Sequence, residues 1–299
     1  MLQTYDERNA DIVYWADGVL RHRDEPGISP FDSAVQGGDA VWEGLRLYDG
    51  AIFGLPAHLT RLRRSAAALN FAAVPADADI IGAIAATLRA NRMYDGVHIR
   101  LTLTRGVKIT SGMDPRLNRA GPTLIVLAEH KAPVYDTSGL TLVTASTRRP
   151  SPDVLDPKIH HNNLLNSILA KLEANAAGAD DALMLDQRGF VAETNATHLF
   201  AVVAGALHTP RTVACPEGIT RQTVLDLAPA NGVEASVRDI SLAEMYAADE
   251  VFCTGTMGEI AGVTTIDGRP IGTGKVGPVT GRIAALYRQH ASTHGVAVL

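Results

Sequence analysis

The sequence is poor in cysteine and lysine and has no long apolar run, and each scarcity excludes a class of protein. The two cysteines, Cys215 and Cys253, could pair by number alone, but we expect both to be free and buried because no export signal is visible. The first residues carry acidic groups where a signal peptide needs a basic start and an apolar run. No stretch approaches the roughly 18 uninterrupted apolar residues of a membrane span. We therefore expect a soluble, cytoplasmic protein with no membrane partner.

The rest of the composition is typical of a globular protein, with 46% hydrophobic residues, 20% charged residues and a mean hydropathy of +0.06. A formal net charge of −5 gives no reason to expect nucleic acid as a partner. The 27 basic residues include only five lysines, so a search for a catalytic lysine has few candidates. These are Lys108, Lys131, Lys158, Lys171 and Lys275.

Strand and helix patterns are mixed along the chain, with several hairpin signals, which favours an α+β fold over a doubly wound parallel sheet. Residues 41–48 have a strand pattern, Asp49-Gly50 is a hairpin turn signal, and Pro56 opens a helix. We interpret residues 131–136 as a linker between a small α/β domain, 1–130, and a larger domain, 137–299. Further helices are predicted at 79–93 and 163–177, from 220 and after 278, and further strands at 97–104, 123–128, 140–147, 182–186, 190–193, 198–203 and near 251.

Lys158 is the lysine whose surroundings favour chemistry. It follows a strand and the proline-rich loop 150–157, and it precedes an amphipathic helix. A lysine at such a place can be partly desolvated, so that its neutral amine can form an imine with an aldehyde cofactor. The alternative is an ordinary surface lysine at a helix start, a position that the helix dipole slightly disfavours.

Glu193 and Arg61 could serve the same cofactor. Glu193 ends a short strand, and a carboxylate there can keep a pyridine nitrogen protonated. Arg61 lies on the first long helix and could clamp a phosphate through its planar fork. Taken alone, each residue is better explained as a solvated charged group.

Two glycine-containing loops can present backbone amides to a phosphate. The loop PEGITR, 216–221, runs into a helix, so the amides of Ile219 and Thr220 would lie at a helix N-terminus, a ready anion site. The loop TGTMG, 254–258, follows a strand, and its small residues permit a close backbone approach to a ligand. Either loop alone is weak evidence, since glycine turns are common.

Two other motifs do not support a function of their own. The sequence GTGKVG, 272–277, matches a dinucleotide-binding pattern, but only 22 residues follow it and none of them is acidic. A second strand and a ribose-binding acid are therefore lacking, which argues against a nicotinamide oxidoreductase. His160 and His161 are adjacent and point apart on any regular element, so we expect no metal site.

The order of the motifs resembles the class IV aminotransferases that depend on pyridoxal 5′-phosphate (PLP), a group with branched-chain and D-amino-acid aminotransferases and aminodeoxychorismate lyase. The resemblance runs from about Asp32 to the last residue. GLRLY, His-Ile-Arg and GTMGEI are most similar to the branched-chain members. The motifs are VWEGLRLYDG, HLTRL, HIRLTLTRG, Lys158 before a helix, GADDALMLDQRGFVAETNATHLF, PEGITRQTVLDLA, DEVFCTGTMGEI and IDGRPIGTGKVGPVT.

The resemblance implies fold type IV, in which a small N-terminal α/β domain and a larger domain with a barrel-like sheet enclose the active site. It also implies PLP as cofactor and a homodimer in which a loop of the neighbour helps to close the pocket. Lys158 would be the Schiff-base lysine and general base, and Glu193 the partner of the ring nitrogen. The implied phosphate ligands are Arg61, Ile219, Thr220 and Thr256, and the implied substrate residues are Trp42, His98, Arg100, Met257 and Gly258.

Gly37, His98 and Asn163 stand where tyrosines are common in the family. Asn163 takes the place of a tyrosine that bonds the cofactor's phenolic oxygen, and we keep it as a cofactor ligand because an amide can also donate. Loss of two pocket hydroxyls at 37 and 98 removes polar contacts of the kind that dominate discrimination between substrates. His98 with Arg100 and Arg105 could rebuild a carboxylate site, or the changes could only repack the strands.

The resemblance therefore implies a transaminase that moves an amino group between a branched-chain L-amino acid and a 2-oxo acid such as 2-oxoglutarate. One alternative on the same fold is a transaminase for D-amino acids or (R)-amines. The other is a PLP lyase of the aminodeoxychorismate lyase type, against which GLRLY and GTMGEI argue.

Overall fold

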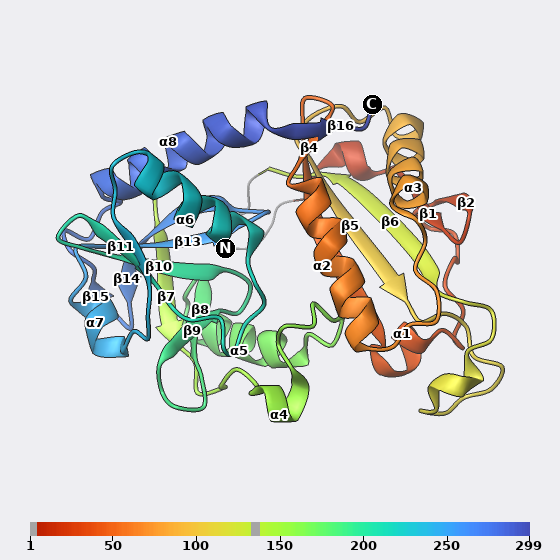
Figure 1. Cartoon of the computed structure of the whole chain (residues 1–299), viewed down its shortest axis with the longest axis horizontal. Helices are drawn as coiled ribbons and strands as arrows, with labels where there is room; N and C mark the ends of the chain where they lie inside the picture. Colours follow the sequence, from red (N-terminus) through yellow and green to blue (C-terminus); the bar gives the residue numbers. More distant parts are fainter. Residues whose placement is uncertain (1–4, 133–137) are drawn as a thin grey trace. The chain divides into compact units, whose positions relative to one another are not determined.

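A computed structural model describes residues 5–132 and 138–299, which fall into two compact units (Figure 1). The first unit holds the described residues up to Ala132 together with Ile159–Asn163 and Ala291–Leu299. The second unit holds residues 138–158 and Leu164–His290. The predicted domain boundaries did not include the segments Ile159–Asn163 and Ala291–Leu299 in the first unit. Both segments add hydrogen bonds to its sheet. Of the predicted linker, residues 133–136 lie outside the described residues.

The sheet of the first unit is antiparallel throughout, with the strand order β16-β4-β3-β5-β6-β1-β2. The strands predicted at 41–48 and 97–104 are confirmed as β3 and β5. The strands of this sheet are β1 (Val13–Ala16), β2 (Val19–His22), β3 (Ala40–Tyr48), β4 (Ala51–Phe53), β5 (Val97–Thr104), β6 (Thr123–His130) and β16 (Gly295–Ala297).

The predicted hairpin between β3 and β4 is confirmed by its turn. Asp49 and Gly50 both have positive φ, 47° and 78°, as the tight turns that match strand twist require. Helices α2 (Leu55–Ala68) and α3 (Asp77–Ala90) pack apolar residues against the sheet and close its core. The short helices of this unit are η1 (Glu7–Asn9), α1 (Ser33–Gly37) and η2 (Pro115–Leu117).

The sheet of the second unit is mixed, and among the described residues it has nine strands in the order β12-β11-β10-β13-β14-β7-β8-β9, with β15 paired to β14. The pairs β11–β12, β14–β7 and β7–β8 are parallel. This mixture of pairings confirms the α+β class. The strands are β7 (Leu140–Thr144), β8 (Asp181–Leu185), β9 (Val191–Thr194), β10 (His198–Val203), β11 (Ala206–Thr209), β12 (Ala235–Val237), β13 (Glu250–Gly255), β14 (Glu259–Ile266) and β15 (Arg269–Pro270).

The predicted helices of the second unit are confirmed, and the structure adds two short ones at 152–155 and 242–246. The stretch 150–157, predicted as a loop, contains one helical turn, α4 (Pro152–Leu155). Its proline stands at the first helical position, where a helix tolerates proline. The predicted helix at 163–177 is confirmed as α5 (Leu165–Ala176). The others are α6 (Ile219–Ala230), α7 (Leu242–Tyr246) and α8 (Pro278–Thr293). No helix in the described part of the chain is long and apolar enough to cross a membrane.

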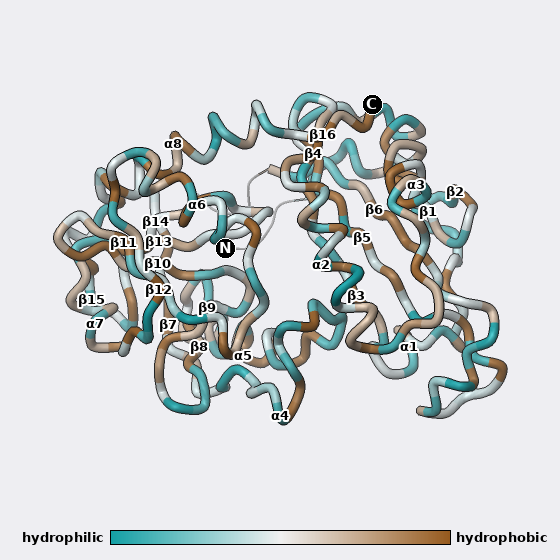
Figure 2. The backbone as a smooth tube through the Cα atoms, viewed as in Figure 1, coloured by the Kyte–Doolittle hydropathy of each residue, from teal (hydrophilic) through white to brown (hydrophobic). Residues whose placement is uncertain are grey.

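Apolar side chains of the central strands form a separate core in the second unit, and Phe200 stacks on Phe252 with ring centroids 4.9 Å apart. Figure 2 shows the hydrophobic stretches along the strands of both units. Cys215 and Cys253 are buried and free, as expected. Burial raises the pKa of Cys253 to about 12, so this thiol stays protonated.

The glycine-rich sequence at 272–277 serves the start of α8. The Glu250 carboxylate accepts the amides of Val279 and Thr280 at 3.0 and 2.7 Å. A Cβ on Gly277 would lie 2.0 Å from the carboxyl carbon of Glu250, so only glycine permits this approach. The chain's own carboxylate therefore occupies the helix N-terminus that a nucleotide phosphate would need.

Candidate active site

Lys158 lies in a turn after α4, and its amine is held by the loop that leads into α6. Lys158 Nζ donates to Thr212 Oγ1 at 2.8 Å and lies 3.4 Å from Glu217 Oε1. The backbone N–H of Lys158 donates to Asp156 Oδ1 at 2.9 Å. The side chain is 40% exposed, so it is covered in part, and the groups in contact with the amine are a hydroxyl and a carboxylate.

Glu193 lies on β9 and is buried, which corrects the view of it as a solvated group at a strand end. Arg149 Nη2 lies 2.9 Å from Glu193 Oε1, and the two side chains are 12% and 7% exposed. A buried carboxylate requires such a partner. The sequence analysis did not identify Arg149, because it precedes α4 and α5 in the sequence whereas Glu193 follows them.

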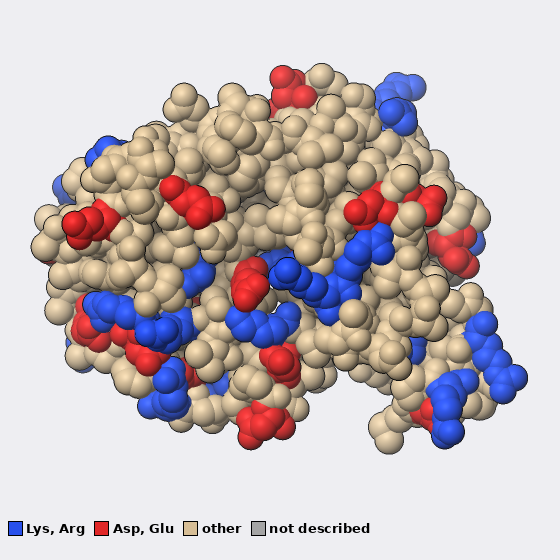
Figure 3. Space-filling view, in the orientation of Figure 1, with Lys and Arg blue, Asp and Glu red and all other residues tan. Residues whose placement is uncertain are grey.

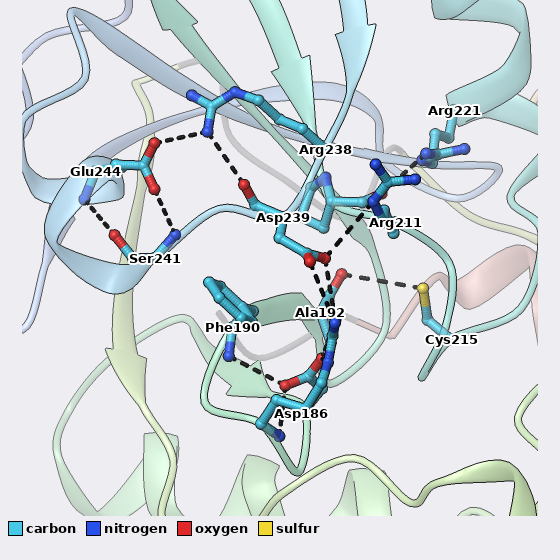
Figure 4. Close-up of polar contacts among 12 residues, drawn as sticks. Asp186, Phe190, Ala192, Arg211, Cys215, Arg221, Arg238, Asp239, Ser241 and Glu244 are labelled. Atoms are coloured by element: carbon cyan, nitrogen blue, oxygen red, sulfur yellow. Dashed lines mark hydrogen bonds and ion pairs between the residues drawn. The ribbon is translucent and has the colours of Figure 1, made fainter.

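The turn between β8 and β9 fixes the strand that carries Glu193 (Figure 4). Asp186 accepts the backbone amides of Arg188 and Phe190 at 2.8 and 3.0 Å. The Arg188 guanidinium then pairs with both Asp186 and Asp239, at 2.8 and 3.0 Å. Figure 3 shows that basic and acidic side chains also lie next to one another elsewhere on the face in view.

Cys215 is a buried centre around which the charged groups gather. Burial and the neighbouring Glu193 raise the pKa of the Cys215 thiol, against the opposing charges of Arg149, Arg221 and Lys158. Ligand atoms of Glu193, His198 and Cys215 lie within 4.8 Å of one another. Because a thiol binds metal as the thiolate, and because Glu193 is paired with Arg149, this group is poorly suited to a metal ion.

The start of α6 has the features of an anion site. Its N-cap, Gly218, provides no side-chain cap, and the first amides of a helix have no partner within it. These first amides belong to Ile219 and Thr220, as predicted. A Cβ on Gly218 would lie 2.2 Å from His198 Cδ2, so glycine is required here. Arg221 holds the preceding loop through Thr209 Oγ1 and the Pro210 carbonyl, at 3.1 and 2.9 Å.

Thr256, Met257 and Gly258 form the turn between β13 and β14, where Gly255 pairs with Glu259. Glu259 has a φ of +52°, the left-handed residue that follows a three-residue turn. The tip of this hairpin lies beside the turn after β9, since a Cβ on Gly255 would lie 3.1 Å from Thr197 Cγ2. The second unit thus brings together the predicted residues Lys158, Glu193, Ile219, Thr220 and the turn 256–258.

In the first unit, Arg61 on α2 is bound to a buried carboxylate of β3, Glu43. Arg61 Nε and Nη2 donate to the two Glu43 oxygens at 2.9 and 2.6 Å. His58 Nδ1 lies 2.7 Å and His160 Nδ1 3.4 Å from the same carboxylate, whose side chain is 0% exposed. Burial alone would raise the pKa of Glu43, but His160 and the hydrogen bonds from Arg61 and His58 hold it well below its usual range. Glu43 therefore orients the Arg61 guanidinium through Nε and Nη2, and the role of Arg61 as a phosphate ligand remains a prediction.

Trp42 and Arg100 lie on the opposite face of the same sheet and contact each other. The Arg100 guanidinium lies 3.5 Å from the Trp42 ring centroid, and the His160 ring stacks on Trp42 at 4.3 Å. Arg100 Nη2 donates to Asn162 Oδ1 at 2.5 Å. Burial lowers the pKa of Arg100 to about 10, and in the described part of the chain no carboxylate lies within ion-pair distance of it. Asn162, which sequence reasoning missed, is thus the neighbour that holds the predicted substrate arginine.

His98 and Arg46 face each other across β5 and β3, next to Arg100. His98 is 8% exposed, and neither of its ring nitrogens has a hydrogen-bond partner among the described residues. Burial and the charges of Lys131, Arg100 and Arg46 lower the pKa of His98 to about 3. A neutral histidine therefore stands in a row of cations.

Arg105 and Asn163 are the two remaining residues of this unit for which a role was predicted. Arg105 pairs with Asp39 at 2.5 Å and donates to the Leu69 carbonyl at 2.8 Å, so it does not join His98, and the prediction for it is wrong. Arg46 is the arginine beside His98 instead. The backbone of Asn163 packs against Gly38, whose Cβ would lie 3.7 Å from it. The residue is exposed, and its role as a cofactor ligand remains a prediction.

Comparison with known proteins finds similar chains among aminotransferases. Residues 40–266 match the family model of amino-transferase class IV. The chain is 54% identical over 291 residues to branched-chain-amino-acid aminotransferase-like protein 2 of Arabidopsis thaliana, covering 97% of this chain and 52% of that protein. It thus spans about half the length of this relative. A putative branched-chain-amino-acid aminotransferase of Methanocaldococcus jannaschii is 39% identical, over 95% of this chain and 98% of that protein.

Solved structures of similar proteins share the fold. The T.th. branched-chain amino acid aminotransferase complexed with N-(5′-phosphopyridoxyl)-L-glutamate has a TM-score of 0.88, with 34% identity over 95% of both chains. The same enzyme with pyridoxamine 5′-phosphate has a TM-score of 0.89, with 33% identity over 95% of both chains. The prediction of fold type IV is confirmed.

Proposed function

Because the chain belongs to the class IV aminotransferase family, we propose that it is a PLP-dependent transaminase. It moves an amino group between a branched-chain L-amino acid and a 2-oxo acid such as 2-oxoglutarate. The observation that carries the proposal is the gathering of Lys158, the Glu193–Arg149 pair and the uncapped start of α6 in one unit. An amine, a partner for the ring nitrogen and an anion site are what such a cofactor requires.

The residues present fit PLP by their chemistry. The first amides of α6, Ile219 and Thr220, and the hydroxyl of Thr256 suit a phosphate. Thr254 Oγ1, two residues before Thr256, is buried and has no partner among the described residues, as expected of a group that awaits a ligand. Arg61 would add positive charge, its orientation fixed by Glu43. When bound, PLP supplies an aldehyde for the amine and a ring that accepts electrons.

Lys158 is the group that moves the proton. Its amine rotates on a flexible stem, and at 40% exposure it can exchange protons with water. Thr212 Oγ1 accepts a hydrogen bond from the amine, and Glu217 Oε1 pairs with it. Release from these two contacts frees the lysine to act as a general base toward the substrate α-carbon.

Arg100 and His98 are the proposed receptors for substrate carboxylate. A buried guanidinium is held by a neutral amide and an aromatic face, so its charge is not offset by a carboxylate in the described residues. Such a charge favours an anionic ligand, and this supports a dicarboxylic 2-oxo acid. The His98 ring, which lacks hydrogen-bond partners among the described residues, can donate one hydrogen bond to the same anion. For the second unit, the family resemblance assigns the backbone groups of Met257 and Gly258 to the substrate carboxylate.

The branched-chain donor is the finer part of the proposal. The relatives named as branched-chain aminotransferases support it, and Trp42 offers aromatic surface for an aliphatic side chain. Arg100 and His160 contact its ring and Nε1 donates to the His161 carbonyl at 3.0 Å, so the ring is held in one orientation. A screen for PLP bleaching on addition of L-leucine, D-alanine, D-glutamate and (R)-1-phenylethylamine tests this choice. Faster conversion by a D-amino acid or by the amine would overturn the branched-chain donor and leave the transaminase intact.

An apolar face of α5 supports a homodimer. Leu165, Ile168, Leu169 and Leu172 recur at helical spacing, and each is more than half exposed. A two-fold assembly can cover the same patch on both copies. We expect sedimentation equilibrium to give a dimer and Leu169→Glu to give a monomer, with Val154→Glu on α4 as the exposed control. A monomeric wild type would contradict this assembly.

The cysteines support a cytoplasmic location. Cys215 and Cys253 are buried thiols, and chains with free cysteines are typical of reducing compartments. Fractionation of cells with an antibody to the chain tests this placement.

A further inference from the structure

Arg149 holds the carboxylate that the proposed function assigns to the cofactor's ring nitrogen. Resting on that function, we propose that Arg149 is a positioning residue that keeps the proton on the ring nitrogen by pairing with Glu193. No sequence pattern pointed to it, because Arg149 belongs to none of the loops or motifs that indicated the cofactor.

The contacts of Arg149 join four segments of the second unit. Its backbone N–H donates to the Leu185 carbonyl at the end of β8, at 3.0 Å. Nε donates to the Ala214 carbonyl in the loop before α6, at 3.1 Å. Nη1 donates to Asn166 Oδ1 and Ser167 Oγ in the first turn of α5, at 3.3 and 3.2 Å. Nη2 is left for Glu193 Oε1 at 2.9 Å. Every nitrogen of the guanidinium has a partner, so its plane and its direction are fixed.

Of the partners of the Arg149 side chain, only Glu193 carries a charge. Ala214, Asn166 and Ser167 offer neutral oxygens, whereas Glu193 offers a carboxylate. Both members of the pair are nearly buried, at 12% and 7% exposure. In a site that water barely reaches, the charge of the arginine acts mainly on the nearest ionisable group, which is Glu193.

The sign of the effect follows from distance. An opposite charge in contact with a carboxylate favours its ionised form, so a proton shared with a pyridine nitrogen stays on the nitrogen. Removal of Arg149 should raise the proton affinity of Glu193 more than that of the ring, because Arg149 contacts the carboxylate directly and would act on the ring only through it. The proton would then lie on Glu193, and a neutral ring would accept electrons less well.

The test is ¹⁵N NMR of the holoenzyme loaded with PLP labelled at the ring nitrogen, with free PLP in acid and alkali as references. We expect the wild type at the pyridinium position and Arg149→Met shifted toward the neutral position. Arg149→Lys, which keeps the charge, should recover at least half of that shift. Arg148→Met, the exposed arginine next in the chain, should match the wild type. An Arg149→Met enzyme that stays at the pyridinium position overturns the proposal.

A second variant keeps the test open if Arg149→Met does not fold. Asn166→Asp adds a competing carboxylate at the Nη1 contact and should move the ring-nitrogen signal in the same direction by a smaller amount. Asn166→Ala removes the same hydrogen bonds without adding charge and should leave the signal unchanged. If Asn166→Asp also leaves it unchanged, the link between Arg149 and the proton is absent.

Glu193→Gln separates this inference from the proposed function. A protein that binds no PLP, or a Glu193→Gln enzyme that keeps the pyridinium signal, means that the assigned role of Glu193 fails. A signal that moves in Glu193→Gln but not in Arg149→Met or Asn166→Asp rejects only the role of Arg149. A merely structural Arg149 would change the unfolding temperature of the apoprotein without changing this signal.

Discussion

Glu43 and Glu193 are two buried glutamates that each pair with an arginine, one in each unit. Glu43 is 0% exposed and receives Arg61 through both oxygens, with His58 and His160 beside it. Glu193 is 7% exposed and meets Arg149 through Oε1. In the first pair the arginine is the group offered to a ligand and the glutamate orients it. In the second pair these roles are reversed. The glutamate is the more deeply buried partner in both pairs, so the same ion pair can prepare a site for an anion or for a protonated ring, depending on which partner meets the ligand.

The largest expected difference between the two pairs is in stability. Glu43→Gln leaves the Arg61 guanidinium buried without a counter-ion, and we expect a loss of about 3–5 kcal/mol in the free energy of unfolding. Glu193→Gln should lose less, because Arg149 keeps three neutral oxygen partners. Urea unfolding of the apoproteins measures both values. The double variant Glu43→Gln/Arg61→Met should recover most of the loss, and equal losses in the two single variants would break the comparison.

The second prediction concerns the rate. Glu193→Gln should keep PLP bound and slow proton transfer on the order of 100-fold, since the ring nitrogen loses its charged partner. Single-turnover bleaching with L-leucine measures the step without product release. Bleaching at the wild-type rate would mean that Glu193 has only a structural role.

The third prediction concerns cofactor affinity. Arg61→Met should raise the dissociation constant for PLP by about 10- to 100-fold, which corresponds to the loss of one charge-assisted hydrogen bond. Arg63→Met, a neighbour on α2 that pairs with Asp77 instead, is the matched control. Titration of the apoprotein gives both constants. An unchanged constant in Arg61→Met would remove Arg61 from the phosphate site.

The effect that is smallest at neutral pH is a pH dependence of stability that belongs to the first unit. The pKa of His98 falls from its ordinary value to about 3 in the folded chain, so the unfolded chain binds more protons between these values. Stability should therefore fall as the pH is lowered from about 6.5 toward 3, by up to about 1.4 kcal/mol per pH unit for this one group. His98→Asn should remove that slope. If the free energy of unfolding depends on pH with the same slope in the wild type and in His98→Asn, His98 does not have the lowered pKa.

The sequence predicted turns and helix starts, because their conformation depends on residues that are adjacent in the chain. Asp49-Gly50 predicted its hairpin, and Gly218-Ile219-Thr220 predicted a helix start that could bind an anion. The motifs also identified Arg61 and Glu193. Their partners were missed because ion pairs form between segments that are distant along the chain. Glu43 lies 18 residues from Arg61, and only the packing of α2 on β3 brings them together.

Burial was the other property that the sequence could not supply. Taken alone, Glu193 was better explained as a solvated group at a strand end, yet it is buried, and Lys158 is 40% exposed beside polar groups. The sequence did not show this, because exposure depends on the strands and loops that cover a residue and not on its neighbours in sequence. Arg105 was assigned to the carboxylate site for its nearness in sequence, yet Asp39 binds it elsewhere.

Borohydride reduction of the PLP-loaded protein, followed by peptide mapping, tests the central claim most directly. The account predicts that the reduced pyridoxyl label is recovered on Lys158 and that Lys158→Ala takes up no label while keeping its fold. Recovery of the label on Lys108, Lys131, Lys171 or Lys275 would contradict it.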